Sequence, residues 1–141
     1  MKEKKIPLNE IIILGRSFGG AVAIPLAAKY TPRALIVEAS FTSLADVGAK
    51  LHPFFPVKWL LKESYNSIEL LPTVKSPVLV VHSRDDQLVP YSEGQRLFEA
   101  ASHPKRFLQI TGPHDNRNHP DSQALYRKGI DSFLRYLASR K

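Results

Sequence analysis

The segment over residues 15–20 has the residue types and the spacing that nucleophilic catalysis by a serine requires. It reads Gly-Arg-Ser-Phe-Gly-Gly, a G-x-S-x-G pattern centred on Ser17. A nucleophilic serine stands on a sharp turn with its hydroxyl exposed, and such a turn leaves no room for a Cβ at the flanking positions. Because Gly15 and Gly19 meet this need, the pattern predicts that Ser17 is a nucleophile. The alternative is a glycine-rich turn with an incidental serine.

A nucleophilic serine needs a general base, and the base needs a carboxylate that orients it. Asp86 follows the third apolar run of the chain and His114 follows the fourth, which gives the order serine, acid, base. All three residues fall at the carboxyl ends of predicted strands, the edge where open α/β sheets bind their ligands. Asp85 and Glu38 remain alternatives for the acid.

The other titratable residues carry no pattern that would give them a role in the chemistry. The remaining histidines are His52, His82, His103 and His119. No pair of histidines or carboxylates has metal-ligand spacing, so we expect no metal and no other cofactor. The chain has no cysteine, which excludes a disulfide framework and a thiolate nucleophile.

Short apolar runs alternate with helical stretches, which is typical of a parallel sheet with helices on its faces. We expect four strands, over residues 10–14, 34–38, 78–82 and 106–110. Helices are expected over 21–30, 43–51, the stretch after Pro90, and 121–140. Pro25 predicts a kink or an early end in the first of these helices. Ser92, followed three residues later by Gln95, predicts a capping box at the start of the third.

The segment over residues 51–75 is expected to be a cap-like insertion. Its first part is dense in large apolar side chains and is broken by prolines, which keep it from packing as an ordinary helix. We expect Phe54, Phe55 and Trp59 to wall an acyl pocket at the edge that carries Ser17. A plain hydrophobic anchor is the alternative.

The composition is that of one soluble domain. The 141 residues are 43% hydrophobic and 23% charged, which suits a single core and argues against disorder. No apolar run approaches the ~18 residues that cross a bilayer, so we expect no stable membrane insertion. The basic start over residues 1–5 leads into no long apolar stretch. We therefore expect no signal peptide and a cytoplasmic location.

The net charge of +7 raises the question of a nucleic-acid partner. Residues 101–141 hold eight basic and three acidic residues, whereas residues 51–100 hold five basic and six acidic ones. The excess coincides with the predicted last helix and comes with no aromatic-rich basic stripe or recognition motif. We expect a solvated basic face and no nucleic-acid partner.

Three motifs of the chain resemble those of the α/β-hydrolases. They are the segment 15–20 as the nucleophile elbow, His82-x-x-x-Asp86-x-x-Val89-Pro90 as the acid loop, and Gly112-x-His114 as the histidine loop. The resemblance is greatest to small α/β-hydrolase-domain proteins related to serine aminopeptidases and acyl-protein thioesterases. Residues 41–44 and 54–56 are also similar to that branch. The family usually has glycine where this chain has Ser83, and Pro113 directly before the histidine is a second departure.

The resemblance implies Ser17 as the nucleophile, Asp86 as the acid and His114 as the base. The backbone N–H of Phe18, at the amino end of the following helix, is the expected oxyanion donor. The expected substrate is a small molecule with an acyl group, either a carboxylic ester or a thioester. A serine aminopeptidase-like peptidase and a non-catalytic fragment that associates with another chain are the alternatives.

The resemblance also implies an eight-stranded sheet with strand order 1-2-4-3-5-6-7-8, of which this chain matches strands five to eight. Residues 1–141 are thus expected to form a single fragment of that domain, without the loop that carries the second oxyanion donor. The apolar edge at residues 11–14 would then be open. We expect the isolated chain to be nearly inactive and to self-associate through this edge, or to need a partner chain that supplies the absent half.

Overall fold

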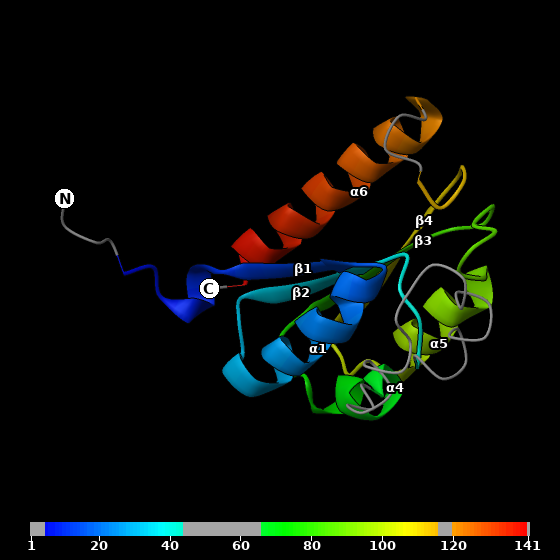
Figure 1. Cartoon of the computed structure of the whole chain (residues 1–141). Helices are drawn as coiled ribbons and strands as arrows, with labels where there is room; N and C mark the ends of the chain where they lie inside the picture. The colour runs from blue at the N-terminus through cyan, green and yellow to red at the C-terminus, as the bar shows by residue number, and fades with distance from the viewer. Residues whose placement is uncertain (1–4, 44–65, 116–119, 141) are drawn as a thin grey trace.

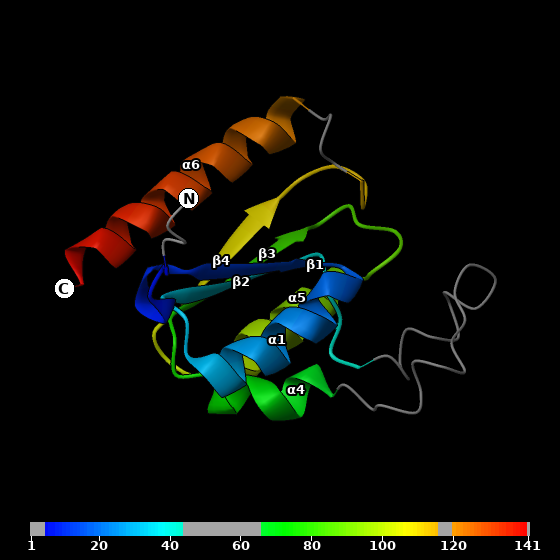
Figure 2. The ribbon, with the colours of Figure 1, turned by 60° about the vertical axis from the view of Figure 1, so that its left-hand side comes forward.

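The computed structural model describes residues 5–43, 66–115 and 120–140 as one layer of strands between two layers of helices (Figures 1 and 2). The strands are β1 (Ile12–Arg16), β2 (Ala34–Glu38), β3 (Val78–Ser83) and β4 (Lys105–Ile110). They form one parallel sheet of order β1-β2-β3-β4. Helices α1 (Phe18–Tyr30), α4 (Ser67–Leu70) and α5 (Tyr91–Ala100) cover one face, and α6 (Pro120–Ser139) covers the other. The 3₁₀ turns η1 (Leu8–Glu10) and η2 (Leu71–Thr73) precede β1 and β3.

The two central strands are buried from end to end. Every residue of β2 and β3 is buried, whereas the outer strands β1 and β4 are only partly so. Helices on both faces exclude water from the middle of the sheet, which is why these strands are almost continuously apolar. The α/β class with four parallel strands is confirmed.

Each face of the sheet has its own core. On the α1 side, Ile24 and Leu97 pack with Leu35, and on the α6 side Phe133 and Leu137 pack with residues of alternate strand positions. The structure describes the last residues of the expected insertion, 66–75, and residues 67–73 of this stretch form α4 and η2. Leu71 and Val74 of this stretch are buried in the α1-side core.

The strands begin and end within two residues of their predicted bounds, but three local expectations differ. The helix α1 begins earlier, at Phe18, and runs past Pro25 to Tyr30, so of the two outcomes predicted for Pro25, a kink or an early end, the early end does not occur. The helix continues because Ile24 and Ala27 on either side of the proline are fully buried against the sheet, and this packing offsets the lost hydrogen bond. The predicted helix over residues 43–51 lies outside the described residues, apart from Ser43.

The predicted capping box is also wrong. The helix α5 begins at Tyr91 with Pro90 as its N-cap, and no side chain caps it. Ser92 is therefore the second residue of the helix, two positions after the N-cap, so it does not stand outside the helix as a cap requires. The Glu93 N–H donates instead to the Pro90 carbonyl at 2.9 Å.

Candidate active site

Ser17 stands on a strained turn between the end of β1 and the start of α1. Its φ of 51° and ψ of −119° lie in a region that non-glycine residues rarely occupy. Two contacts hold the turn: the Ser17 N–H donates to the Glu38 carbonyl at 2.8 Å, and the Ser40 hydroxyl donates to the Ser17 carbonyl at 2.8 Å. Strain of this kind costs about 1–3 kcal/mol and persists only where neighbours over-determine it.

Glycines let the chain fold back on itself at this turn. A Cβ on Gly15 would lie 2.4 Å from the Gly19 carbonyl oxygen, so the expectation for Gly15 is confirmed. For Gly19 it is wrong, because outside its own helix nothing lies within 4 Å of a Cβ there. Gly20 carries the second constraint, since its Cβ would meet the Ser40 hydroxyl at 2.1 Å.

His114 and Asp86 join Ser17 in one chain of hydrogen-bonded side chains. The His114 Nε2 lies 3.2 Å from the Ser17 Oγ, and the His114 Nδ1 lies 2.7 Å from the Asp86 Oδ2. When the Nδ1–H donates to the carboxylate, the Nε2 lone pair faces the serine hydroxyl. The imidazole can then accept the hydroxyl proton, and the carboxylate can stabilise the charged ring.

The environment of Asp86 keeps its carboxylate ionised. Its Oδ1 accepts the N–H groups of Leu88 at 2.9 Å and Val89 at 2.8 Å, and its side chain is fully buried. Burial alone would raise the pKa of Asp86, but the hydrogen bonds from His114 and from the Val89 N–H outweigh it and lower that pKa below its usual value.

The two alternative acids have other partners. The Asp85 Oδ2 accepts the Gly112 N–H at 3.0 Å, and the Glu38 Oε1 accepts the Arg16 Nε–H at 3.1 Å. Of the three candidate carboxylates, Asp86 is the one that contacts the His114 ring.

Comparison with known proteins gives this arrangement a family. The chain is 40% identical over 128 residues to an uncharacterised protein of Mycobacterium tuberculosis. The aligned segment covers 90% of this chain and 44% of the relative. It is 31% identical over 132 residues to α/β hydrolase domain-containing protein 17B of Xenopus laevis, covering 92% of this chain and 42% of that protein. The chain thus spans about half the length of the curated relatives it matches.

Solved structures show the same fold. The esterase domain from a Rhodothermus marinus protein matches with a TM-score of 0.65 at 24% identity, over 81% of this chain and 55% of that one. A monoacylglycerol lipase of Paleococcus ferrophilus matches with a TM-score of 0.67 at 15% identity, over 94% of this chain and 69% of that one. The chain belongs to the α/β-hydrolase superfamily. No protein-family model matches it.

The histidine loop of this α/β-hydrolase chain is anchored by residues to which the sequence pointed only indirectly. Ser83, where the family usually has glycine, donates its hydroxyl to the Gly112 carbonyl at 2.5 Å and accepts the Asp85 N–H at 3.1 Å. Gly112 has a φ of 92°, which a residue with a Cβ would rarely adopt. Pro113 then leads directly into His114. The departure at Ser83 therefore contributes a bond that braces the loop.

His82 braces the acid loop, a role for which its isolated position gave no signal beyond the four-residue spacing from Asp86. Its ring is fully buried, with Nε2 3.0 Å from the Val89 carbonyl and 3.7 Å from the Asp86 Oδ2. Burial lowers the pKa of His82, so the ring is neutral and its Nε2–H donates to Val89. Gly94 allows this packing, because a Cβ there would lie 2.5 Å from the His82 ring.

Of the remaining predicted site residues, the structure describes Phe18 alone. Phe18 is the first residue of α1, so its backbone N–H lies at the positive end of the helix dipole, and its ring packs edge-on against Phe41 at 5.3 Å. Phe54, Phe55 and Trp59 lie outside the described residues.

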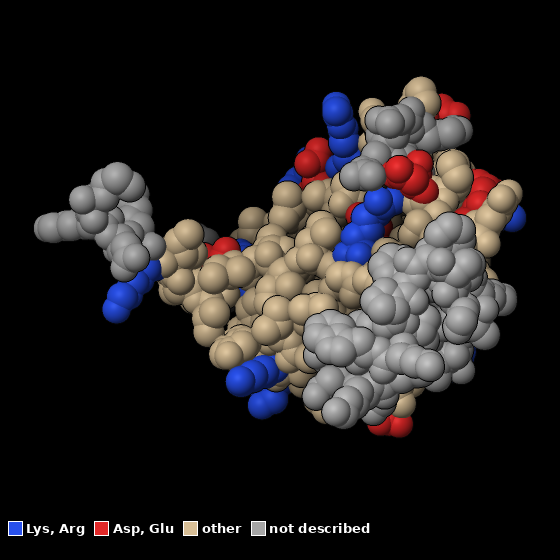
Figure 3. Space-filling model, in the orientation of Figure 1, with Lys and Arg blue, Asp and Glu red and all other residues tan. Residues whose placement is uncertain are grey.

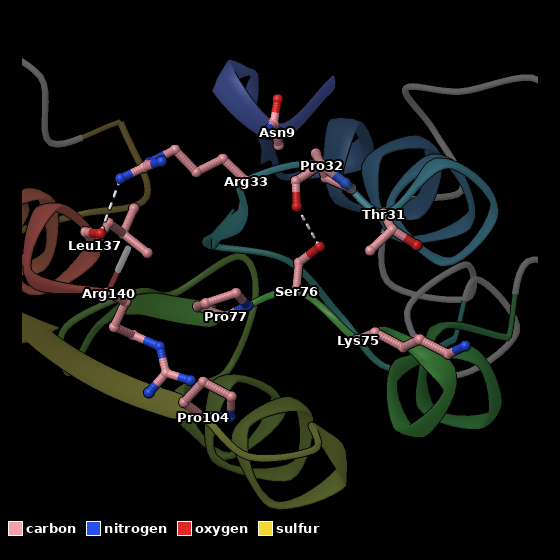
Figure 4. Close-up of a pocket in the computed structure, with 10 residues that line it drawn as sticks. All are labelled: Asn9, Thr31, Pro32, Arg33, Lys75, Ser76, Pro77, Pro104, Leu137 and Arg140. Atoms are coloured by element: carbon pink, nitrogen blue, oxygen red, sulfur yellow. Dashed lines mark hydrogen bonds between the residues drawn. The ribbon is translucent and has the colours of Figure 1, made fainter. Parts of the chain in front are cut away.

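A cavity in the described part of the α/β-hydrolase fold lies far from Ser17. Figure 4 shows it with Arg33, Pro77 and Pro104, which directly precede β2, β3 and β4. It therefore opens at the amino ends of the strands, opposite the edge that holds the serine. Within the described ranges, no helix is long and apolar enough to cross a membrane, and no three histidine, cysteine or acidic side chains gather as a metal would need.

Proposed function

We propose that this chain supplies the nucleophile, base and acid of a serine hydrolase that acts on carboxylic esters or thioesters. The observation that carries the proposal is the unbroken contact from the Ser17 Oγ to His114, at 3.2 Å, and from His114 to Asp86, at 2.7 Å. These separations fall within or close to the reach of a hydrogen bond that transfers a proton.

The proposed reaction has two halves. The Ser17 Oγ attacks the carbonyl carbon of the substrate while its proton passes to the His114 Nε2. The tetrahedral intermediate then collapses, the bond to the leaving oxygen or sulfur breaks, and His114 returns the proton to that atom. In the second half, His114 takes a proton from water as the water oxygen attacks the carbonyl carbon of the acyl-serine. The second tetrahedral intermediate collapses, the bond to the Ser17 Oγ breaks, His114 returns the proton to that oxygen, and the free acid leaves. Asp86 stabilises the charged imidazole throughout.

The amino end of α1 is suited to the negative charge that develops on the carbonyl oxygen. The Phe18 N–H follows the nucleophile directly, at the end of the helix where the dipole is positive. We assign one oxyanion donor to this group. The aromatic wall of Phe54, Phe55 and Trp59 remains a proposal about the acyl pocket.

The names of two structural neighbours, an esterase domain and a monoacylglycerol lipase, favour esters over peptides. The test is hydrolysis of three matched substrates by the full chain: a p-nitrophenyl ester, a thioester of the same acid and an aminoacyl p-nitroanilide. We expect slow, Ser17-dependent turnover of the first two, with Ser17→Ala as the control. Turnover of the anilide alone would support the peptidase alternative, and turnover that Ser17→Ala retains would overturn the proposal.

We also propose that the chain self-associates through the outer side of β1. The Leu14 side chain on this strand is 51% exposed. Val22, Leu26 and Tyr30, spaced four residues apart on α1, are exposed as well, and the surface over this part of the molecule is largely free of charge (Figure 3). Within the described residues β1 pairs with β2 alone, so its other edge offers backbone groups to a second strand.

A further inference from the structure

Arg16, the residue directly before the serine, touches the loop that carries the base. Its Nη2–H donates to the His114 backbone carbonyl at 2.5 Å, and its Nε–H donates to the Glu38 Oε1 at 3.1 Å. Its Nη1 lies 3.8 Å from the Asp115 Oδ1. One guanidinium therefore connects the ends of β1 and β2 to the histidine loop.

Glu38 holds the Arg16 side chain in place. Its backbone carbonyl accepts the Ser17 N–H at 2.8 Å, while its carboxylate, only 8% exposed, accepts from Arg16. The Tyr126 hydroxyl of α6 is hydrogen-bonded to the same carboxylate, and burial together with this carboxylate raises the pKa of Tyr126 to about 12. Glu38 therefore holds both the Ser17 backbone and the Arg16 side chain, which in turn contacts His114.

We propose that Arg16 is a positioning residue that, braced by Glu38, sets the distance between the Ser17 Oγ and the His114 Nε2. The inference rests on the proposed function, in which this distance decides whether the proton can move. Ser83 and Asp85 anchor the histidine loop at Gly112, two residues before the base. The Arg16 bond is made at His114 itself.

Arginine suits this position better than lysine. Its planar fork presents Nε and both Nη atoms in fixed directions, so that it can hold a carboxylate and a carbonyl at once. A lysine ammonium on a flexible stem can replace one of these contacts but orients neither. Because reacting groups must be held closely in place, a misplacement of about 1 Å can cost ~10²-fold in rate.

The test compares Arg16→Gln and Arg16→Lys with Arg33→Gln in the full chain. Arg33 is the matched control, because its guanidinium also donates to a backbone carbonyl, that of Leu137 at 2.8 Å, but at the opposite end of the sheet. Three quantities are measured: the second-order rate of Ser17 labelling by a fluorophosphonate, the low-field proton resonance of the His114–Asp86 hydrogen bond, and the thermal unfolding midpoint.

We expect Arg16→Gln to lower the labelling rate ~10²-fold and to broaden the low-field resonance, with Arg16→Lys between it and the wild type. Arg33→Gln should leave the labelling rate and the low-field resonance unchanged, while it shifts the thermal unfolding midpoint about as much as Arg16→Gln does. A wild-type labelling rate and a retained resonance in Arg16→Gln would overturn the proposal, as would an equal loss in Arg33→Gln.

Two further outcomes separate this proposal from the proposed function. A wild-type chain that resists labelling but shows a resonance that Arg16→Gln loses would refute the hydrolase and support the positioning role. A wild-type chain with neither signal would contradict both. If Arg16→Gln fails to fold, Glu38→Gln tests the same link, with a ~10-fold slower labelling rate expected and an unchanged rate contradicting the proposal.

Discussion

The carboxyl edge of the sheet and the outer side of β1 differ in how many of their side chains have partners within the chain, although β1 contributes to both. At the carboxyl edge, Asp86 accepts three hydrogen bonds and Glu38 is bonded to Arg16. On the outer side, only two residues before Arg16, Leu14 is half exposed. The polar groups proposed for catalysis have hydrogen-bond partners within this chain, whereas the exposed apolar side chains of β1 and α1 form the surface through which we propose that the chain self-associates.

The largest expected effect falls on the carboxyl edge. Ser17→Ala or His114→Ala should lower kcat for ester hydrolysis by ~10⁴–10⁶-fold, because the two residues act in one proton transfer. The double variant should cost little more than either single one. Steady-state kinetics on a p-nitrophenyl ester measure this, and multiplicative losses in the double variant would show that the two side chains act independently.

A second prediction separates the adjacent acids of the same edge. Asp86→Asn should lower kcat by ~10⁴-fold, because the His114 ring loses the carboxylate that sets its tautomer. Asp85→Asn should cost ~10-fold or less, since its carboxylate holds the Gly112 N–H and not the ring. The same kinetic assay decides between them. An Asp85→Asn loss as large as that of Asp86→Asn would mean that the assignment of the acid is wrong.

The third prediction concerns the outer side of β1. Leu14→Glu should shift the chain toward smaller species in sedimentation velocity, because a charge on this edge opposes strand pairing. Leu134→Glu is the matched control, since Leu134 is also an exposed leucine but lies on α6. An equal shift in both variants, or a monomeric wild type, would contradict self-association through β1.

The smallest effect is the pH dependence of stability that Asp86 contributes. Its pKa lies below the usual 3.8 in the folded chain, so the unfolded chain binds a proton first as the pH falls. The stability from this group is present above about pH 4 and is lost as the pH falls through the folded pKa. Denaturant unfolding should show a smaller loss of free energy over this range in Asp86→Asn than in the wild type. Part of the loss should remain in the variant, because hydrogen bonds from Thr42 lower the pKa of Glu93 against the effect of burial.

The features that the sequence predicted well are those that depend on local pattern. The four strands follow from apolar runs, and the meeting of Ser17, Asp86 and His114 follows from their places after three parallel strands. Parallel strands bring such positions to one edge whatever the details of packing. The side chains therefore meet as expected.

The features that it missed depend on contacts between distant elements. Nothing local distinguishes Gly19 from Gly20, because the constraint on Gly20 comes from Ser40 after the next strand. The helix continues through Pro25 because the residues before and after the proline pack in the core, and helix propensities do not take such packing into account. Arg16 reaches a carbonyl 98 residues away, so its part in the site is visible only once the fold is known.

The central claim is that Ser17 is a nucleophile activated by His114. Reaction of the full chain with a fluorophosphonate, followed by peptide mass spectrometry, tests it most directly. We predict one adduct per chain, on Ser17, with no adduct in Ser17→Ala and a rate at least ~10²-fold lower in His114→Ala. An unmodified Ser17 in the wild type, or an equal rate in His114→Ala, would contradict the account.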